Sequence, residues 1–167
     1  MAGPLSSLRD KVRTSLRRRS EERAPGPPRG TSGGSDRRGD GPDGIDVAYA
    51  PEHDGEPDPG EVVWSWVPYE DDPSQGKDRP VLILGHDGPQ LAGVPLSSRD
   101  HGDRADAHEW VEVGRGGWDR SGRVSYADAA RLLRIDPVDV RREGAALHRA
   151  RFDEVVARVE ALHAWHR

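Results

Sequence analysis

The sequence predicts a mainly β protein, a small and partly open β-barrel that carries a C-terminal helix. Short strand patterns follow one another between residues 61 and 135, and an amphipathic helical pattern comes after them. All five Trp lie after residue 60, whereas eight of the fourteen Pro lie before it, so the capacity to bury a core is concentrated in the later part. We therefore expect a disordered tail over residues 1–58 and one domain over residues 59–167.

The tail is basic at first and acidic afterwards. Residues 1–24 hold seven basic side chains against three acidic ones, and their apolar residues (Leu5, Leu8, Val12 and Leu16) repeat at helical spacing. Such a short basic helix is either a solvated tail or an anchor for an anionic membrane or nucleic acid. Residues 25–59 are rich in Gly, Pro, Asp and Ser, which predicts a flexible linker that buries no core.

The first strands are predicted from alternation and from one apolar run. Residues 61–69 (EVVWSWVPY) alternate in a way that predicts a strand, and the turn-forming segment 70–78 (EDDPSQGKD) predicts a polar loop. Residues 80–85 (PVLILG) are continuously apolar over a strand's length, so we expect a strand that is buried on both faces.

Three further strands complete the predicted sheet. Residues 90–96 (QLAGVPL) and 107–113 (AHEWVEV) each have strand length and apolar content. The segment 124–135 has a helical composition, yet it lies between a Gly-rich turn and Asp136-Pro137. We interpret it as a turn followed by a last strand over about 130–135.

Two helical segments are predicted at the C-terminal end. Asp136 is a good N-cap with Pro137 at the first helical position. After it, an apolar stripe predicts an amphipathic helix with one face towards the core, formed by Phe152, Val155, Val156, Val159 and Leu162.

Composition excludes several classes of protein. The chain has no Cys, so disulfides and thiolate zinc sites are excluded. A net charge of −5 argues against a generic nucleic-acid-binding surface, although a local cationic site remains compatible with it. No apolar run has the length of a bilayer span, and no signal-peptide pattern opens the chain, which predicts a cytoplasmic protein without a membrane partner.

The segment from Gln75 to Pro80 is the first candidate site. It delivers Lys77 and Arg79 to the start of a buried strand, and a residue before Pro favours extended geometry. A guanidinium fixed at a strand end suits bidentate binding of phosphate. The alternative is an ordinary charged hairpin in which Arg79 pairs with a carboxylate such as Asp78.

The second candidate site is the segment 95–103 at the end of the third strand. Ser97 and Ser98 supply hydroxyls, Arg99 supplies a second guanidinium, and the imidazole of His101 suits proton transfer near neutral pH. A Ser-rich turn capped by Asp and Gly explains the same residues equally well.

Two weaker signals follow along the chain. The acidic and His residues between Asp100 and Glu109 match no defined spacing of metal ligands, so no metal site is predicted. Trp118 stands near Arg115 and Arg120, and it either stacks a nucleobase or packs inside the protein.

Three stretches of the sequence together resemble the MazF/PemK family, the toxins of type II toxin–antitoxin modules. The first is PGEVVWSWVPYEDDPSQGKDRPVLILG at 59–85, in which a Trp-containing strand and a Gly loop precede Arg-Pro and an aliphatic strand. The second is GVPLSS at 93–98. The third, RIDPVDVRREGAALHRARFDEVVARV at 134–159, is similar to the C-terminal part of actinobacterial PemK-like members.

The resemblance implies an SH3-like barrel of the PemK/CcdB type that forms homodimers and cleaves single-stranded RNA without a metal or other cofactor. It also implies a cognate antitoxin as partner, and binding of operator DNA only as a complex with that antitoxin. In the family the Arg of Arg-Pro and the first hydroxyl residue after the Pro carry catalysis, and these positions match Arg79 and Ser97.

The remaining assignments complete the predicted site. His101 is expected to donate a proton to the leaving oxygen, because it lies close to Ser97 in the sequence and titrates in the right range. Lys77, Ser98, Arg99 and Trp118 are expected to contact the substrate. The alternative function is a non-catalytic small barrel that binds nucleic acid or protein, since small barrels carry many unrelated functions.

Overall fold

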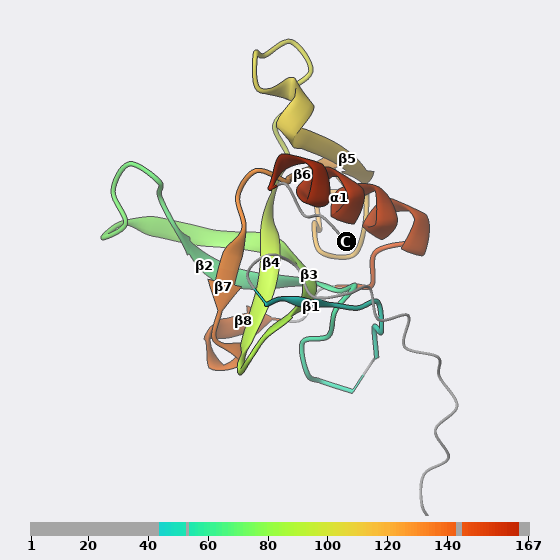
Figure 1. Cartoon of the computed structure of the whole chain (residues 1–167). Helices are drawn as coiled ribbons and strands as arrows, with labels where there is room; N and C mark the ends of the chain where they lie inside the picture. Colours follow the sequence, from blue (N-terminus) through green and yellow to red (C-terminus); the bar gives the residue numbers. More distant parts are fainter. Residues whose placement is uncertain (1–43, 53, 143–144, 164–167) are drawn as a thin grey trace, which may run out of the picture. The chain divides into compact units, whose positions relative to one another are not determined.

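The structure, a computed structural model, describes residues 44–52, 54–142 and 145–163. In this part the chain forms an eight-stranded antiparallel sheet and one α-helix near the C-terminal end (Figure 1). The prediction of a mainly β fold with a C-terminal helix is confirmed, and the sheet does not close into a complete barrel. The predicted basic helix in residues 1–24 and the linker up to residue 43 lie outside the described residues.

The strands follow a simple neighbour order, β5-β6-β4-β3-β2-β8, with β1 paired to β3 and β7 paired to β4. Their bounds are Asp46–Val47 (β1), Val62–Pro68 (β2), Gly76–Asp87 (β3), Gln90–Ser97 (β4), Trp110–Gly114 (β5), Ser125–Asp128 (β6), Leu133–Ile135 (β7) and Val140–Arg142 (β8). The helix α1 spans Arg149–Leu162. The edges of the main path are therefore β5 and β8.

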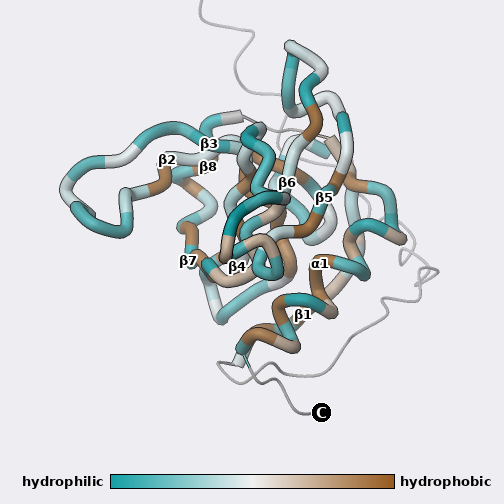
Figure 2. Tube along the Cα trace, turned by 90° about the horizontal axis from the view of Figure 1, so that it is seen from above, coloured by the Kyte–Doolittle hydropathy of each residue, from teal (hydrophilic) through white to brown (hydrophobic). Residues whose placement is uncertain are grey.

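The hairpin of β2 and β3 is longer than its sequence suggests. The predicted loop 70–78 ends early, because Gly76 already pairs with Pro68 and the pairing continues to Ser65↔Arg79 and beyond. The remaining turn is closed by a hydrogen bond from the Tyr69 N–H to the Gln75 carbonyl (2.8 Å) and is hydrophilic in Figure 2. Arg79 thus lies on a paired strand instead of at its border with a loop.

Both faces of the sheet bury apolar side chains. One face packs against α1, and its cluster includes Val62, Leu82 and Leu84. The other face holds a smaller cluster that includes Val63 and Val81. The run 80–85 is therefore buried on both faces, as predicted, because its successive side chains enter opposite clusters.

The folded part begins earlier than predicted. Ile45 is fully buried and Val47 nearly so, and both belong to the main core cluster. β1 pairs with β3 through Val47↔Gly85, and a Cβ at Gly85 would lie 2.1 Å from the Asp46 carbonyl oxygen, so this approach requires glycine. All described residues belong to one compact unit. The expectation that residues up to 59 bury no core is wrong for this segment.

Replacing Ile45 tests the contribution of this early segment. Ile45→Ala is expected to lower the free energy of unfolding by about 2–5 kcal/mol, because it removes buried methyl groups and leaves a cavity. Urea unfolding measures the change. Asp46→Ala is the matched control, since Asp46 is the exposed residue next to Ile45, at the start of β1. Equal stabilities of the two variants would show that the segment does not pack on the core.

Two predicted strands have other bounds in the structure, the one over residues 107–113 and the one over about 130–135. The first begins with a 3₁₀ turn, Ala107–Glu109, before β5. In the second region β7 lies within the strand predicted over about 130–135, whereas residues predicted as the turn before it form β6. β6 pairs with the end of β4 and β7 with its beginning, so tertiary pairing overrides the helical composition of the segment.

Of the two helices predicted at the C-terminal end, one is confirmed and one is not. The Asp136 carboxylate accepts a hydrogen bond from the Val138 N–H (3.1 Å), but the capped segment is only the 3₁₀ turn Pro137–Asp139. The helix predicted there is wrong, because β8 follows at once and pairs with β2. The second helix is confirmed as α1, which alternates apolar and polar residues in Figure 2. In the described part of the chain no helix has the length and apolarity to cross a bilayer.

Candidate functional site

A cavity of about 520 Å³ opens between the ends of β3 and β4 and the residues beside β5 and β6. Six of the seven residues predicted from the sequence line it, namely Lys77, Arg79, Ser97, Ser98, Arg99 and His101. Local sequence patterns do not identify the other lining residues, which are Glu70, Pro95, Leu96, Arg104, Trp110, Asp128 and Arg131. The two candidate segments of the sequence therefore form one site.

Strand register explains why distant segments meet here. Val81 on β3 pairs with Pro95 on β4. Arg79 lies two residues before Val81, and Ser97 lies two residues after Pro95, so antiparallel pairing places them at the same end of the two strands. Alternation places these two side chains on the same face as Val81 and Pro95. On the next strands Ser97 pairs with Tyr126, and Trp110 pairs with Asp128. The cavity thus lies on the sheet face opposite the α1 core.

Arg79 is the central cation of this cavity. Its side chain is half-buried, and within the described residues it has no ion pair and no side-chain hydrogen bond. Burial lowers the pKa of the guanidinium below its ordinary value, and Arg131 is the next cause in the same direction. The alternative in which Arg79 pairs with Asp78 is not realised, because Asp78 pairs with Arg141 (3.1 Å). A desolvated, unpaired guanidinium is prepared to bind an anion.

The charges of the other side chains that line the cavity also favour an anion. Five lining side chains are basic (Lys77, Arg79, Arg99, Arg104 and Arg131), and two are acidic (Glu70 and Asp128). The Arg131 side chain is held by the Pro68 carbonyl and lies 3.6 Å from the Glu70 carboxylate. A net positive cavity in a chain of net charge −5 concentrates anions at one place.

Ser97 offers a hydroxyl that can donate into the cavity. Its Oγ accepts a hydrogen bond from the Arg99 N–H (3.1 Å), which fixes the side chain at the end of β4. The hydroxyl proton has no acceptor among the described residues. The turn that follows is also stabilised by the Gly102 N–H donating to Asp100 (2.8 Å), so the Ser-rich turn and the hydroxyl site coexist.

His101 forms part of the cavity wall. Its ring stacks on Trp110 with centroids 3.5 Å apart and planes inclined by 9°, and only 7% of the residue is exposed. Neither ring nitrogen has a hydrogen-bond partner among the described residues. Burial lowers the pKa of His101 below its ordinary value, with Arg104 acting in the same direction. The lowered pKa favours the neutral form of the imidazole.

This burial predicts a pH dependence of stability. The unfolded chain binds the proton at the ordinary His pKa near 6.5, whereas the folded chain binds it only at lower pH. The titration of His101 therefore leaves the free energy of unfolding unchanged well above pH 6.5. This free energy falls as the pH decreases from about 6.5 through the lowered pKa. His101→Phe keeps an aromatic ring beside Trp110 without titrating.

Urea unfolding at pH 7.5 and pH 5.5 checks this expectation. The wild type is expected to lose more stability between the two pH values than His101→Phe. Equal losses would mean that His101 is not held neutral by the fold.

Asp128 is a second titratable group in the cavity. Burial raises the pKa of this carboxyl above its ordinary value, and Glu70 and Glu109 add to the effect. Its Oδ1 accepts a hydrogen bond from the Ala130 N–H (3.2 Å). Local sequence patterns do not identify Asp128 and Trp110, because only the pairing of β4, β5 and β6 brings them beside Ser97. Arg131 follows β6 and is held by its contacts with Pro68 and Glu70. Strand alternation places Trp110 and Asp128 on one face, but it does not reveal the partner strand.

Trp118 does not belong to the site, and its expected contact with substrate is wrong for this structure. It is 3% exposed and lies in the main core cluster. Its indole N–H donates to the Ser125 hydroxyl (3.1 Å), so both its apolar ring and its polar group are satisfied inside the protein. A ring buried in this way cannot stack a nucleobase.

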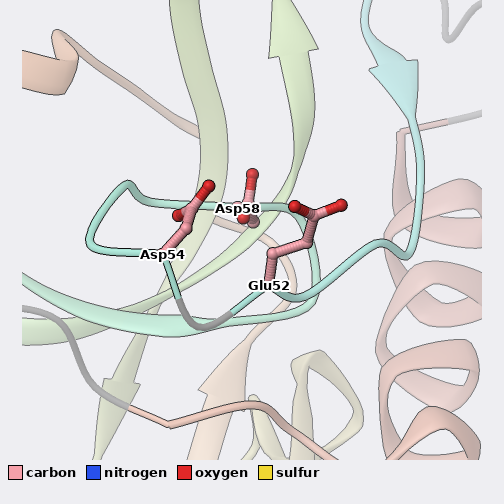
Figure 3. A group of neighbouring side chains, drawn as sticks. All are labelled: Glu52, Asp54 and Asp58. Carbon is pink, nitrogen blue, oxygen red and sulfur yellow. The ribbon is translucent and has the colours of Figure 1, made fainter. Parts of the chain in front are cut away.

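The acidic residues of the chain gather elsewhere. Within the described residues, the segment Asp100 to Glu109 brings no three ligand atoms together, whereas Glu52, Asp54 and Asp58 place theirs within 4.8 Å of one another on the loop before β2 (Figure 3). Burial raises the pKa of Asp58, and repulsion by Asp54 contributes. None of the three lines the cationic cavity, so this group is separate from the candidate site.

The small, mainly β domain places an unpaired arginine, a serine hydroxyl and further cations in one cavity, an arrangement that suits a phosphate-like anion. The profile of a family described as "PemK-like, MazF-like toxin of type II toxin-antitoxin system" matches residues 58–163. The chain belongs to this PemK/MazF family of toxins. The resemblance seen in the three sequence stretches is thereby confirmed.

Solved structures of MazF proteins are similar to the chain at low sequence identity. MazF of Deinococcus radiodurans (form I) is 22% identical with a TM-score of 0.49, covering 65% of this chain and 97% of its own. The MazE–MazF structure from the same organism (form III) is 21% identical with a TM-score of 0.48, covering 66% and 98%. Toxin MazF-mt6 of Mycobacterium tuberculosis is 16% identical with a TM-score of 0.46, covering 64% and 99%. A search of curated proteins finds no match.

Proposed function

We propose that the chain is the toxin of a type II toxin–antitoxin module and that it cleaves single-stranded RNA as a metal-independent endoribonuclease. The observation that carries this proposal is the half-buried, unpaired guanidinium of Arg79 beside the Ser97 hydroxyl in a cationic cavity. Membership of the PemK/MazF family supports the reaction class.

The reaction uses the nucleophile that RNA already contains. The 2′-oxygen forms a bond to the adjacent phosphorus while the bond from phosphorus to the 5′-oxygen breaks. The 2′-hydroxyl gives up its proton to a base, and the 5′-oxygen gains a proton from an acid. The products are a 2′,3′-cyclic phosphate and a 5′-hydroxyl. The protein therefore has to stabilise charge on the phosphoryl oxygens and to move two protons.

We assign each of these tasks to residues of the cavity. Arg79 binds the phosphoryl oxygens and stabilises the charge that develops on them, which a fixed guanidinium does without reorganisation. Ser97 donates a hydrogen bond to the same group from its unused proton. Lys77, Ser98 and Arg99 lie at the exposed margin of the cavity and contact the flanking phosphates.

Two groups are suited to proton transfer. Asp128 has a raised pKa, which brings a carboxyl closer to the range useful near neutral pH. Burial lowers the pKa of His101 and so favours the neutral ring, which suits accepting a proton, whereas the sequence predicts a donor. Its ring nitrogens are shielded, so exchange with substrate requires the segment 98–106 to move away from Trp110.

The proposed partners follow from the family. The MazE–MazF structure from Deinococcus radiodurans contains a toxin with its antitoxin, and we expect a cognate antitoxin for this chain as well. We also expect a homodimer, binding of operator DNA only in complex with the antitoxin, and action in the cytoplasm on RNA.

Incubation of the purified protein with a long single-stranded RNA in EDTA tests the activity. Discrete fragments are the expected result. Intact RNA at micromolar protein would contradict the nuclease proposal, and binding without cleavage would favour the non-catalytic alternative.

A further inference from the structure

Tyr126 is an aromatic side chain beside the candidate site for which the proposed reaction has no role. It pairs with Ser97 across β6 and β4, so both side chains stand on the sheet face that carries the cavity. The residue is half-buried, and its hydroxyl has no hydrogen-bond partner among the described residues. A partly exposed ring next to a phosphate-binding group is a platform for stacking.

The neighbours of Tyr126 form an ordered row across the sheet. Glu112 on β5 pairs with Tyr126, which pairs with Ser97, and Arg79 stands on the next strand of the same face. Adjacent strands are about 4.8 Å apart, so the row steps from a cation through a hydroxyl and an aromatic ring to a carboxylate. A nucleotide has the complementary order of phosphate, ribose and base.

The charges around the phenol favour a base over a phosphate at this position. Burial raises the pKa of Tyr126 above its ordinary value, and the nearby carboxylates of Asp100 and Glu112 also raise it. These carboxylates repel a phosphate and accept hydrogen bonds from amino groups. Adenine and cytosine carry an exocyclic amino group on their pairing edge, whereas uracil carries none.

The other aromatic residues near the cavity are already engaged. Trp110 has one face against His101, and its indole N–H donates to Asp106 (3.4 Å). Trp118 is buried in the core. Tyr126 has no comparable ring contact within the described residues, so no other aromatic ring of this part of the chain covers its face.

We propose that Tyr126 stacks the nucleobase next to the phosphate held by Arg79, and that Glu112 accepts a hydrogen bond from the exocyclic amino group of that base. This inference rests on the proposal that the cavity takes single-stranded RNA. It assigns to this row a preference for adenine or cytosine over uracil at one position of the substrate.

Binding of short 2′-fluoro RNA tests the inference without cleavage, because this RNA lacks the attacking hydroxyl. Fluorescence anisotropy gives the Kd of the wild type for nine-nucleotide chains of A, of C and of U. We expect tighter binding of the A and C chains. Tyr126→Val, which keeps a strand-forming residue, is expected to weaken their binding about tenfold or more. Glu112→Gln is expected to reduce the preference over the U chain.

Trp66→Leu is the control for loss of an aromatic surface, since Trp66 is 41% exposed and does not line the cavity. It is expected to bind as the wild type does. The inference is overturned if the wild type binds none of the chains, if folded Tyr126→Val binds the A and C chains as tightly as the wild type, or if Glu112→Gln keeps the full preference over the U chain. Because Glu112 is exposed, its substitution gives an answer even if Tyr126→Val does not fold.

The cleavage assay separates this inference from the proposed function. A wild type that shows the expected binding but leaves long RNA intact contradicts the nuclease proposal alone. A wild type that cleaves RNA, with Kd values that neither substitution changes, contradicts the role of Tyr126 and Glu112 alone.

Discussion

Arg79→Ala is expected to slow RNA cleavage by about 10²–10³-fold while the protein stays folded. The reason is that the half-buried guanidinium of Arg79 makes no ion pair among the described residues, so its charge can act on the phosphoryl oxygens of the substrate. Single-turnover cleavage of a fixed RNA substrate measures the change in rate. Thermal unfolding of the same samples shows whether the fold is retained.

Two further variants sharpen this expectation. Arg79→Lys keeps the charge but loses the planar pair of donors, so we expect it to recover only part of the rate. Arg120→Ala removes an exposed guanidinium that does not line the cavity and is expected to cleave at the wild-type rate. A folded Arg79→Ala protein that cleaves as fast as Arg120→Ala would remove Arg79 from the mechanism.

Phe152→Ala is expected to lower the free energy of unfolding by about 3–5 kcal/mol. Phe152 is 1% exposed on the inner face of α1, and its ring lies 5.1 Å from that of Tyr49. Tyr49 in turn donates from its hydroxyl to the Leu147 carbonyl (2.8 Å), which ties the segment before β2 to the start of the helix. Small domains have total stabilities of about 5–15 kcal/mol, so this one change removes a large share.

Urea unfolding followed by circular dichroism measures this loss. Val138→Ala is the control, because Val138 is 84% exposed and its truncation leaves no cavity. We expect that control to lie within about 0.5 kcal/mol of the wild type. A Phe152→Ala protein as stable as the control would show that α1 does not cover the sheet as described.

Much of the fold follows from local patterns in the sequence. The alternation before Pro68 and the apolar run after Pro80 predict β2 and the centre of β3, and the stripe that includes Phe152 predicts α1. β1 escapes prediction because two residues in a Gly- and Pro-rich segment carry no periodic signal. The short helix predicted after Asp136 fails because strand pairing with β2 takes over after one turn.

The site is predictable only where its residues are close in sequence. Arg79 and Ser97 stand out through the prolines near them, and Val81↔Pro95 pairing then brings them together. Asp128 and Trp110 reach the cavity through pairing of β5 with β6, which local patterns do not specify. For Trp118 the sequence allows either stacking on a nucleobase or packing inside the protein, and its burial shows that it packs in the core.

In the proposed mechanism the RNA's own 2′-hydroxyl attacks the phosphate held by Arg79 and Ser97. A single 2′-deoxy substitution at the nucleotide on the 5′ side of a mapped cut site tests it most directly. Cleavage at that bond is expected to disappear while other cut sites in the same RNA are still used. The fragments from those sites are expected to end in a 2′,3′-cyclic phosphate. Continued cleavage at the substituted bond would contradict this mechanism.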